Sequence, residues 1–258
     1  MKFTAQQSDD GVTERLFDLT VAGAVVPGVL WTPEAAVGPR PLLLIGHGGS
    51  QHKLFAPLAA YAKNYAKTFH YAVALIDGPG HGARTTQEQS AGFGEKIRQQ
   101  MSRGEGLGGE VLERMMQWAG QAKPEWQAVL DAVQLLDIVG SGGPVGYLGL
   151  SMGALSGISL VADEPRIKAA VFGLAGLHEG SQVLAEAARK LAVPIEFLLQ
   201  WDDEMVSRQA AMALFDAIGS AEKTLHANRG GHGGVPPFER AGWMQFFSRH
   251  LGPAIISP

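Results

Sequence analysis

One serine of this chain stands in a setting that favours nucleophilic chemistry. Residues 149–153 read G-L-S-M-G with Ser151 at the centre, directly after the apolar stretch 144–148. This order predicts a buried strand, a sharp turn with the serine at its apex, and a helix over 154–162. Glycine suits both sides of such a turn because a Cβ atom would clash there. The alternative is a glycine-rich turn that carries an ordinary surface serine.

Strand-like and helix-like segments alternate on both sides of this motif, and they must position it. Alternating apolar residues at 12–21, followed by the segment 24–31, predict an antiparallel hairpin at one edge of a sheet. From residue 41 onward the alternation predicts a mostly parallel sheet with helices on both faces, an α/β fold. The expected buried strands are 41–45, 71–76, 144–150, 167–174 and 194–199, and a further short strand is expected at 223–227. The other expected helices are 53–67, 124–139, 181–191, 208–218 and 238–250.

Residues 84–123 do not fit this alternation. They contain two helix-like pieces, and the glycine-rich run 104–109 separates them. In the second piece, 111–121, Met115 and Trp118 fall on one side at helical spacing. The region is too long for a simple loop, so we expect a short helical cap over the site, with the glycines as a hinge. The alternative is an insertion that only packs on the body.

Composition limits the classes of protein to which the chain can belong. The 258 residues are 46% hydrophobic, which suits one large folded domain over 1–258. The formal net charge is −4 and basic residues form no block, so we expect no nucleic-acid partner. Cysteine is absent, which excludes disulfides and a cysteine nucleophile. We find no signal-peptide pattern and no apolar run of membrane-spanning length, and we therefore expect a cytoplasmic protein without a membrane partner.

Together these features resemble the α/β-hydrolase superfamily over nearly the whole chain. Within it, the chain is similar to small serine esterases and to dienelactone-hydrolase-like members. Dienelactone hydrolases proper use a cysteine nucleophile, whereas Ser151 occupies that place here. The resemblance therefore implies an α/β-hydrolase fold and serine esterase chemistry.

The resemblance also implies a catalytic acid and a histidine, in that order along the chain. Three acids follow the strand expected at 194–199, and the family's D-x-x-V pattern favours Asp203 over Asp202 or Glu204. Near the C-terminus, His232 stands between two glycine pairs, as in the family's G-H motif. A histidine can take and return a proton near neutral pH, and a carboxylate can orient it. The alternative interpretation is that the acids are solvated loop residues and that His232 is an ordinary surface histidine.

An oxyanion hole of two backbone N–H groups completes the expected site. One donor follows the nucleophile and is therefore Met152. The other belongs to the loop 46–50, which reads G-H-G-G-S and resembles the oxyanion loop of esterases. We expect Gly49 to be this donor, with Gly48 as second choice.

The expected reaction is hydrolysis of a small-molecule carboxylic ester through an acyl-enzyme, without a cofactor. Met115 and Trp118 suggest an apolar acyl or aromatic pocket, although such stripes more often belong to a core. His178, in the loop after a buried strand, is a third candidate for the pocket, with a structural role as the alternative. The same triad could act on amides, thioesters or C–C bonds. A non-catalytic ligand-binding protein on the same fold is a further alternative.

Two other motifs are not expected to carry chemistry. The run 78–82 reads G-P-G-H-G and lacks the Lys-Ser/Thr of a phosphate-binding loop, so we interpret it as structural and near the pocket wall. His47, His52 and His81 do not have metalloprotease spacing, and we expect no metal site.

Overall fold

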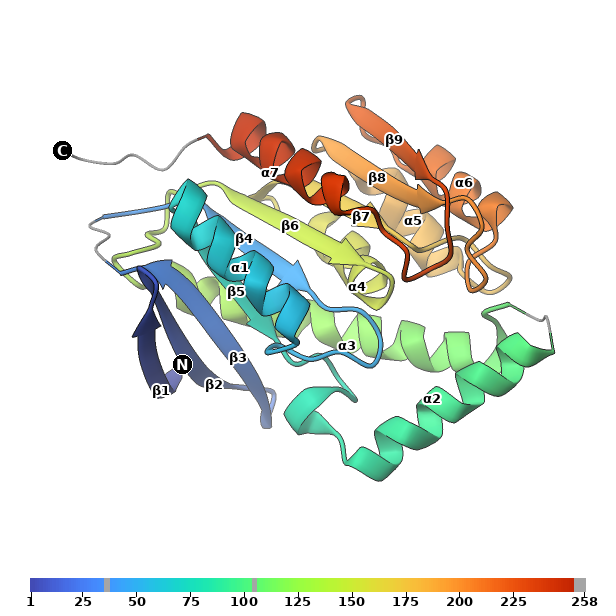
Figure 1. Cartoon of the computed structure of the whole chain (residues 1–258), viewed down its shortest axis with the longest axis horizontal. Helices are drawn as coiled ribbons and strands as arrows, with labels where there is room; N and C mark the ends of the chain where they lie inside the picture. Colours follow the sequence, from blue (N-terminus) through green and yellow to red (C-terminus); the bar gives the residue numbers. More distant parts are fainter. Residues whose placement is uncertain (35–37, 104–105, 253–258) are drawn as a thin grey trace.

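The computed structural model describes residues 1–34, 38–103 and 106–252. Within these ranges the chain forms one nine-stranded sheet in the order β1-β2-β3-β5-β4-β6-β7-β8-β9 (Figure 1). The edge that contains the N-terminus is antiparallel, and from β5 to β9 the strands are parallel. The expected hairpin is present as β2 and β3, and an additional strand, β1, extends it. These three strands are β1 (Lys2–Asp9), β2 (Val12–Val21) and β3 (Ala24–Pro33).

The parallel strands confirm the predicted α/β fold class. Each of them is mostly apolar and almost wholly buried except β9 at the far edge, because helices cover both faces of the sheet. They are β4 (Leu42–Gly46), β5 (Ala72–Ile76), β6 (Val145–Leu150), β7 (Ile167–Gly173), β8 (Ile195–Gln200) and β9 (Lys223–Asn228).

The helices divide between the two faces of the sheet, and each face has its own hydrophobic core. The first core joins α1 and α7 to one face through aromatic residues such as Tyr65 and Phe247. The second core covers the other face, where α3 and α4 pack together (Figure 1). The helices are α1 (Ala56–Phe69), α3 (Gly109–Gln134), α4 (Met152–Val161), α5 (Gln182–Lys190), α6 (Arg208–Ala217) and α7 (Pro237–Leu251).

Helix α3 corrects one boundary that the sequence predicted. We expected separate helices at 111–121 and 124–139, because a proline inside a helix costs about 3 kcal/mol. The structure instead has one helix that runs through Pro124 and ends at Gln134. Buried side chains continue on both sides of the proline, among them Ala119 and Trp126, so the packing of one continuous face offsets the cost.

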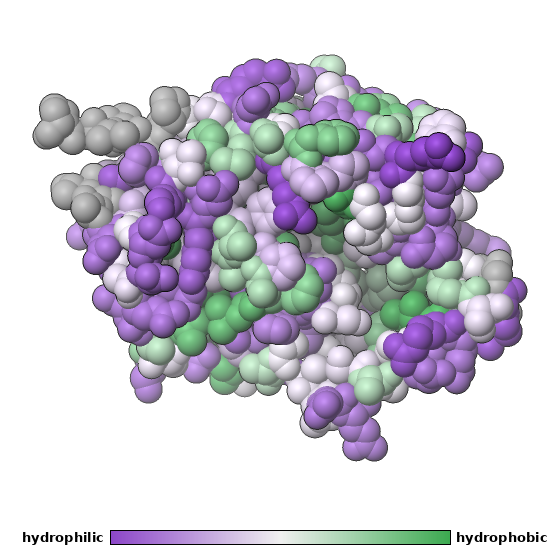
Figure 2. All heavy atoms as spheres, viewed as in Figure 1, coloured by the Kyte–Doolittle hydropathy of each residue, from purple (hydrophilic) through white to green (hydrophobic). Residues whose placement is uncertain are grey.

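Before α3 lie a short 3₁₀ helix, η1 (Gly82–Arg84), and helix α2 (Gln87–Ser102). Helix α2 begins with a capping box at Thr86, and none of its residues is fully buried. Together α2 and the first half of α3 form a helical hairpin that projects beyond the sheet (Figure 1). Figure 2 shows the surface hollowed between this hairpin and the body. We expected the glycine-rich run 104–109 to act as a hinge, and residues 104–105 of this run lie outside the described residues.

Within the described part of the chain, no helix combines the length and apolar character needed to cross a membrane.

Candidate active site

Ser151 lies at the sharp turn between β6 and α4. Its φ of 56° and ψ of −120° place a non-glycine residue in a strained backbone conformation. The two flanking glycines permit this turn: a Cβ atom on Gly149 would lie 2.4 Å from the carbonyl oxygen of Gly153. A Cβ on Gly153 would lie 2.3 Å from the carbonyl oxygen of Gly46. Strain of this kind persists only where the surrounding structure enforces it, which fixes the position of the serine.

His232 lies between Ser151 and Asp203, although the three residues come from separate loops. The Ser151 hydroxyl donates to Nε2 of the ring at 3.0 Å. On the other side of the ring, the Nδ1–H donates to Asp203 Oδ2 at 2.8 Å. This arrangement fixes the neutral tautomer with its proton on Nδ1 and leaves Nε2 free to accept the serine proton.

The Asp203 carboxylate is itself held in place. Its side chain is only 2% exposed, and Oδ1 accepts hydrogen bonds from the backbone N–H groups of Met205 and Val206 at 2.8 and 2.9 Å. Burial alone would raise the pKa of Asp203, but the hydrogen bonds from His232 and from these N–H groups outweigh burial and lower it. The carboxylate therefore stays ionised beside the imidazole.

The two neighbouring acids make different contacts. Asp202 Oδ2 accepts a hydrogen bond from the backbone N–H of Gly230 at 3.3 Å. Glu204 Oε2 accepts one from the backbone N–H of His232 at 2.9 Å. Of the three acids that the sequence left open, Asp203 is thus the one that faces the ring.

The loop after β4 lies beside Ser151 at the same cavity. Gly49 and Met152 both line the cavity that contains Ser151 and His232. The N–H of Gly48, our second choice, donates to Gln51 Oε1 at 2.9 Å. That N–H is therefore already engaged within its own loop.

A buried histidine anchors this loop, a role that the sequence reasoning missed. His47 Nε2 accepts a hydrogen bond from the N–H of Gly78 at 2.9 Å, and Nδ1 donates to the carbonyl oxygen of Gly48 at 2.8 Å. Burial lowers the pKa of His47 to about 4, and the neighbouring His81 contributes to that decrease. The neutral ring therefore ties the loop after β4 to the loop after β5.

Comparison with known proteins identifies the group to which the chain belongs. No protein-family model and no curated protein matches it. Among solved structures, it matches a polyethylene-glycol-bound complex of a novel cold-adapted esterase from an Arctic intertidal metagenomic library. The match has 34% identity and a TM-score of 0.79, and it covers 97% of this chain and 100% of that chain. The chain belongs to the family of this esterase, within the α/β-hydrolase superfamily. Its branch is that of the carboxylic ester hydrolases.

Two further structures extend this comparison. A zinc-bound structure of a novel cold-adapted esterase from an Arctic intertidal metagenomic library is 31% identical, with a TM-score of 0.75, and the match covers 97% of this chain and 100% of that one. An acetyl xylan esterase from Paenibacillus sp. R4 is 15% identical with a TM-score of 0.72, and the match covers 97% and 88%. This acetyl xylan esterase shares the fold of the chain.

The cavity of the hydrolase lies between Ser151 and the hairpin of α2 and α3. It has a volume of about 270 Å³ and opens beside a larger cleft of about 930 Å³. Trp118, which lines both, packs edge-on against His81 and Phe93 at centroid distances of 5.1 and 4.8 Å. The apolar side chains that line the cavity are Phe93, Ile97, Met115, Trp118, Met152 and Met205.

Of the three residues expected in the pocket, two line the cavity and one does not. Met115 and Trp118 line the cavity. His178 is not among the residues that line it; its backbone N–H donates to Ser181 Oγ at 3.1 Å in a turn before α5. Sequence reasoning missed Phe93 and Met205, which come from separate segments and carry no motif.

Proposed function

We propose that the hydrolase is a serine esterase in which Ser151 is the nucleophile, His232 the general base and Asp203 the acid that orients it. The observation that carries this proposal is the position of His232, which hydrogen-bonds Ser151 on one side and Asp203 on the other. A serine hydroxyl is a weak nucleophile by itself, and an adjacent general base activates it.

The reaction proceeds in two halves. His232 takes the proton of Ser151 while Oγ attacks the carbonyl carbon of the ester. The N–H groups of Met152 and Gly49 stabilise the tetrahedral oxyanion, and loss of one such donor typically costs about 10²- to 10³-fold in kcat. As the intermediate collapses, His232 protonates the departing alcohol. Water then attacks the acyl-enzyme with His232 again as base, and the acid is released.

The cavity supports esters with an apolar acyl or aromatic group. Its walls beside Ser151 are apolar and include Met115 and Trp118. We also propose that residues 84–123 act as a cap, because α2 and the first half of α3 supply much of this wall. The proposed boundary at 123 falls inside α3, so the cap and the body share one helix.

Hydrolysis of p-nitrophenyl esters from acetate to palmitate tests the proposal, with Ser151→Ala and Ser141→Ala assayed in parallel. Ser141 is an exposed loop residue before β6, so its variant should retain activity. Ser151→Ala should lower kcat by about 10⁴- to 10⁶-fold and abolish covalent labelling by a fluorophosphonate. Retention of most activity by Ser151→Ala would exclude this mechanism. A folded protein that cleaves none of these esters would direct attention to amides, thioesters or C–C bonds.

A further inference from the structure

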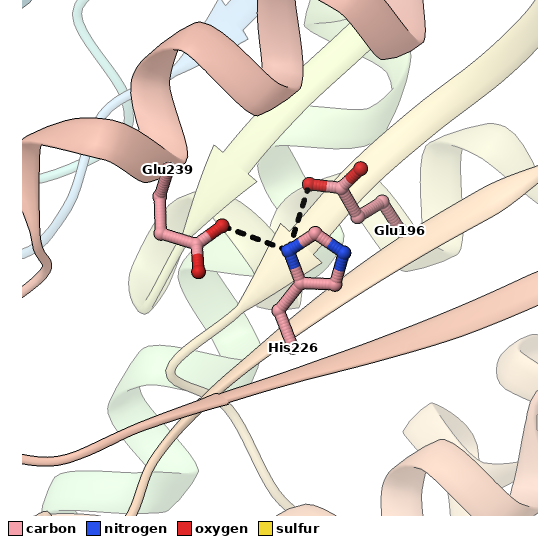
Figure 3. Close-up of side chains that lie close together, drawn as sticks. All are labelled: Glu196, His226 and Glu239. Carbon is pink, nitrogen blue, oxygen red and sulfur yellow. Dashed lines mark hydrogen bonds and ion pairs between the residues drawn. The ribbon is translucent and has the colours of Figure 1, made fainter.

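Outside the cavity, three side chains with metal-binding groups meet between the sheet and α7 (Figure 3). They are Glu196 of β8, His226 of β9 and Glu239 in the first turn of α7. In the β8–β9 register Glu196 pairs with Thr224 and Leu198 pairs with His226. Because alternate residues of a strand share one face, Glu196 and His226 point to the same face, which α7 covers.

The hydrogen bonds within this cluster leave one buried carboxylate oxygen unsatisfied. His226 Nδ1 lies 2.8 Å from Glu239 Oε2 and 3.6 Å from Glu196 Oε1. One N–H group serves only the nearer carboxylate. Glu196 Oε1 has no hydrogen-bond partner within the described residues, and its side chain is only 7% exposed. A buried charged oxygen without a partner is costly, so the cluster lacks one positive centre.

A dication among the two carboxylates and the imidazole would compensate both negative charges of this cluster.

We propose that Glu196, His226 and Glu239 bind one divalent transition-metal ion of the Zn²⁺ type. Their ligand atoms all lie within 4.8 Å of one another. Tetrahedral zinc with bonds of 2.0–2.2 Å places neighbouring ligand atoms about 3.4 Å apart. The two distances from His226 Nδ1, 2.8 Å to Glu239 Oε2 and 3.6 Å to Glu196 Oε1, bracket this value. One imidazole with two carboxylates suits zinc better than calcium or magnesium, which prefer all-oxygen sites.

The surroundings provide orientation and access. Asn228 Nδ2 donates to Glu239 Oε1 at 2.6 Å, which leaves Oε2 directed at His226. Such contacts to the ligands commonly orient them and strengthen binding. The His226 side chain is 38% exposed, so an ion can enter from solvent. With its proton on Nε2, the ring offers the Nδ1 lone pair to the metal, and water completes the coordination.

The position of this site gives the metal a structural role. The loop between β9 and α7 carries His232, with His226 before it and Glu239 after it. A metal bound by both residues would hold the two ends of this loop together and to β8. Binding to the folded state alone raises stability. The metal takes no part in the ester chemistry proposed for Ser151.

Titration of ZnCl₂ into chelator-treated protein, followed by calorimetry, tests this proposal. We expect one zinc per chain, and a rise in Tm of about 5 °C at a zinc concentration a hundred times Kd. Glu196→Gln and His226→Asn should each weaken binding at least tenfold. Glu196→Gln preserves shape and removes the unpaired charge, while His226→Asn alters a partly exposed residue. The Tm of each variant in chelator reports its fold.

A second histidine–glutamate pair serves as the matched control. His250 Nε2 lies 3.2 Å from Glu222 Oε1, and no third metal-binding side chain joins this pair within the part of the chain that the structure describes. Glu222→Gln and His250→Asn should therefore bind zinc like the original protein. Absence of binding heat and of a Tm shift up to millimolar zinc would overturn the proposal, and so would binding that Glu196→Gln and His226→Asn leave unchanged.

Discussion

Glu204 Oε2 accepts a hydrogen bond at 2.9 Å from the backbone N–H of His232, while the adjacent Asp203 accepts one at 2.8 Å from Nδ1 of the same residue. Two consecutive acids thus hold the backbone and the ring of one histidine. The glycine before His232 permits this approach, because a Cβ atom on Gly231 would lie 2.6 Å from Glu204 Oε2. The acid loop therefore positions the histidine loop directly.

Glu204→Ala should lower kcat about tenfold with little change in KM. The substitution removes the acceptor that fixes the His232 backbone, and small misplacement of the proposed general base is costly. Glu204→Gln retains an oxygen acceptor and should stay close to the original rate. Steady-state kinetics with p-nitrophenyl acetate measure both variants. Equal rates for the alanine and glutamine variants would show that this contact does not position His232.

Asp203→Asn should lower kcat by about 10⁴-fold, because an amide favours the wrong tautomer of His232 and cannot stabilise its protonated form. Asp202→Asn is the matched control, since Asp202 contacts the backbone of Gly230 and not the ring. It should retain most of the activity. The same ester assay compares the two, and a larger loss in Asp202→Asn than in Asp203→Asn would reverse the assignment.

The sequence predicts most of the sheet because burial leaves a direct pattern. Continuous apolar runs identify β4 to β8, and the alternating apolar residues at 12–21, followed by the segment 24–31, identify β2 and β3. Strand β1 is exposed along its whole length, so its side chains carry no burial pattern, and only backbone pairing with β2 reveals it. The path of α3 through Pro124 depends on packing, which local propensity does not contain.

The candidate site likewise contains some residues that the sequence predicts and others that only the structure reveals. Ser151 and His232 stand out because glycine-flanked loops have sequence signatures. The D-x-x-V pattern favours Asp203, but the different contacts of Asp203, Asp202 and Glu204 depend on where each carboxylate points. The cavity wall and the anchoring role of His47 depend on segments that meet in space. No pattern along the chain contains that information.

Acid should destabilise the protein through His47. In the unfolded chain this histidine takes a proton near its ordinary pKa of about 6.5, whereas burial holds its pKa at about 4 in the folded state. The unfolded state therefore binds more protons between these values, and stability present above pH 6.5 is lost as pH falls toward 4. Over this window the loss amounts to about 3 kcal/mol. Protonation would also place a hydrogen on Nε2 of His47, which could then no longer accept the hydrogen bond from the N–H of Gly78.

Urea unfolding at several pH values measures this loss. His47→Gln removes the titrating group and retains an oxygen that can accept from Gly78, so its stability should fall less steeply between pH 6.5 and 4. His52→Gln, at an exposed position on the same loop, should behave like the original protein. An equally steep decline in His47→Gln would assign the acid sensitivity to other groups.

Trp118 should limit the length of the acyl group. Its ring lines the cavity beside Ser151 and packs on Phe93 and His81. Trp118→Ala opens space for further methylene groups, each worth about 0.8 kcal/mol when buried. The ratio of kcat/KM for octanoate over acetate should therefore rise about tenfold or more. Trp118→Phe keeps an aromatic wall and should raise the ratio less. If Trp118→Ala changes kcat/KM for both esters by the same factor, the acyl group does not contact this wall.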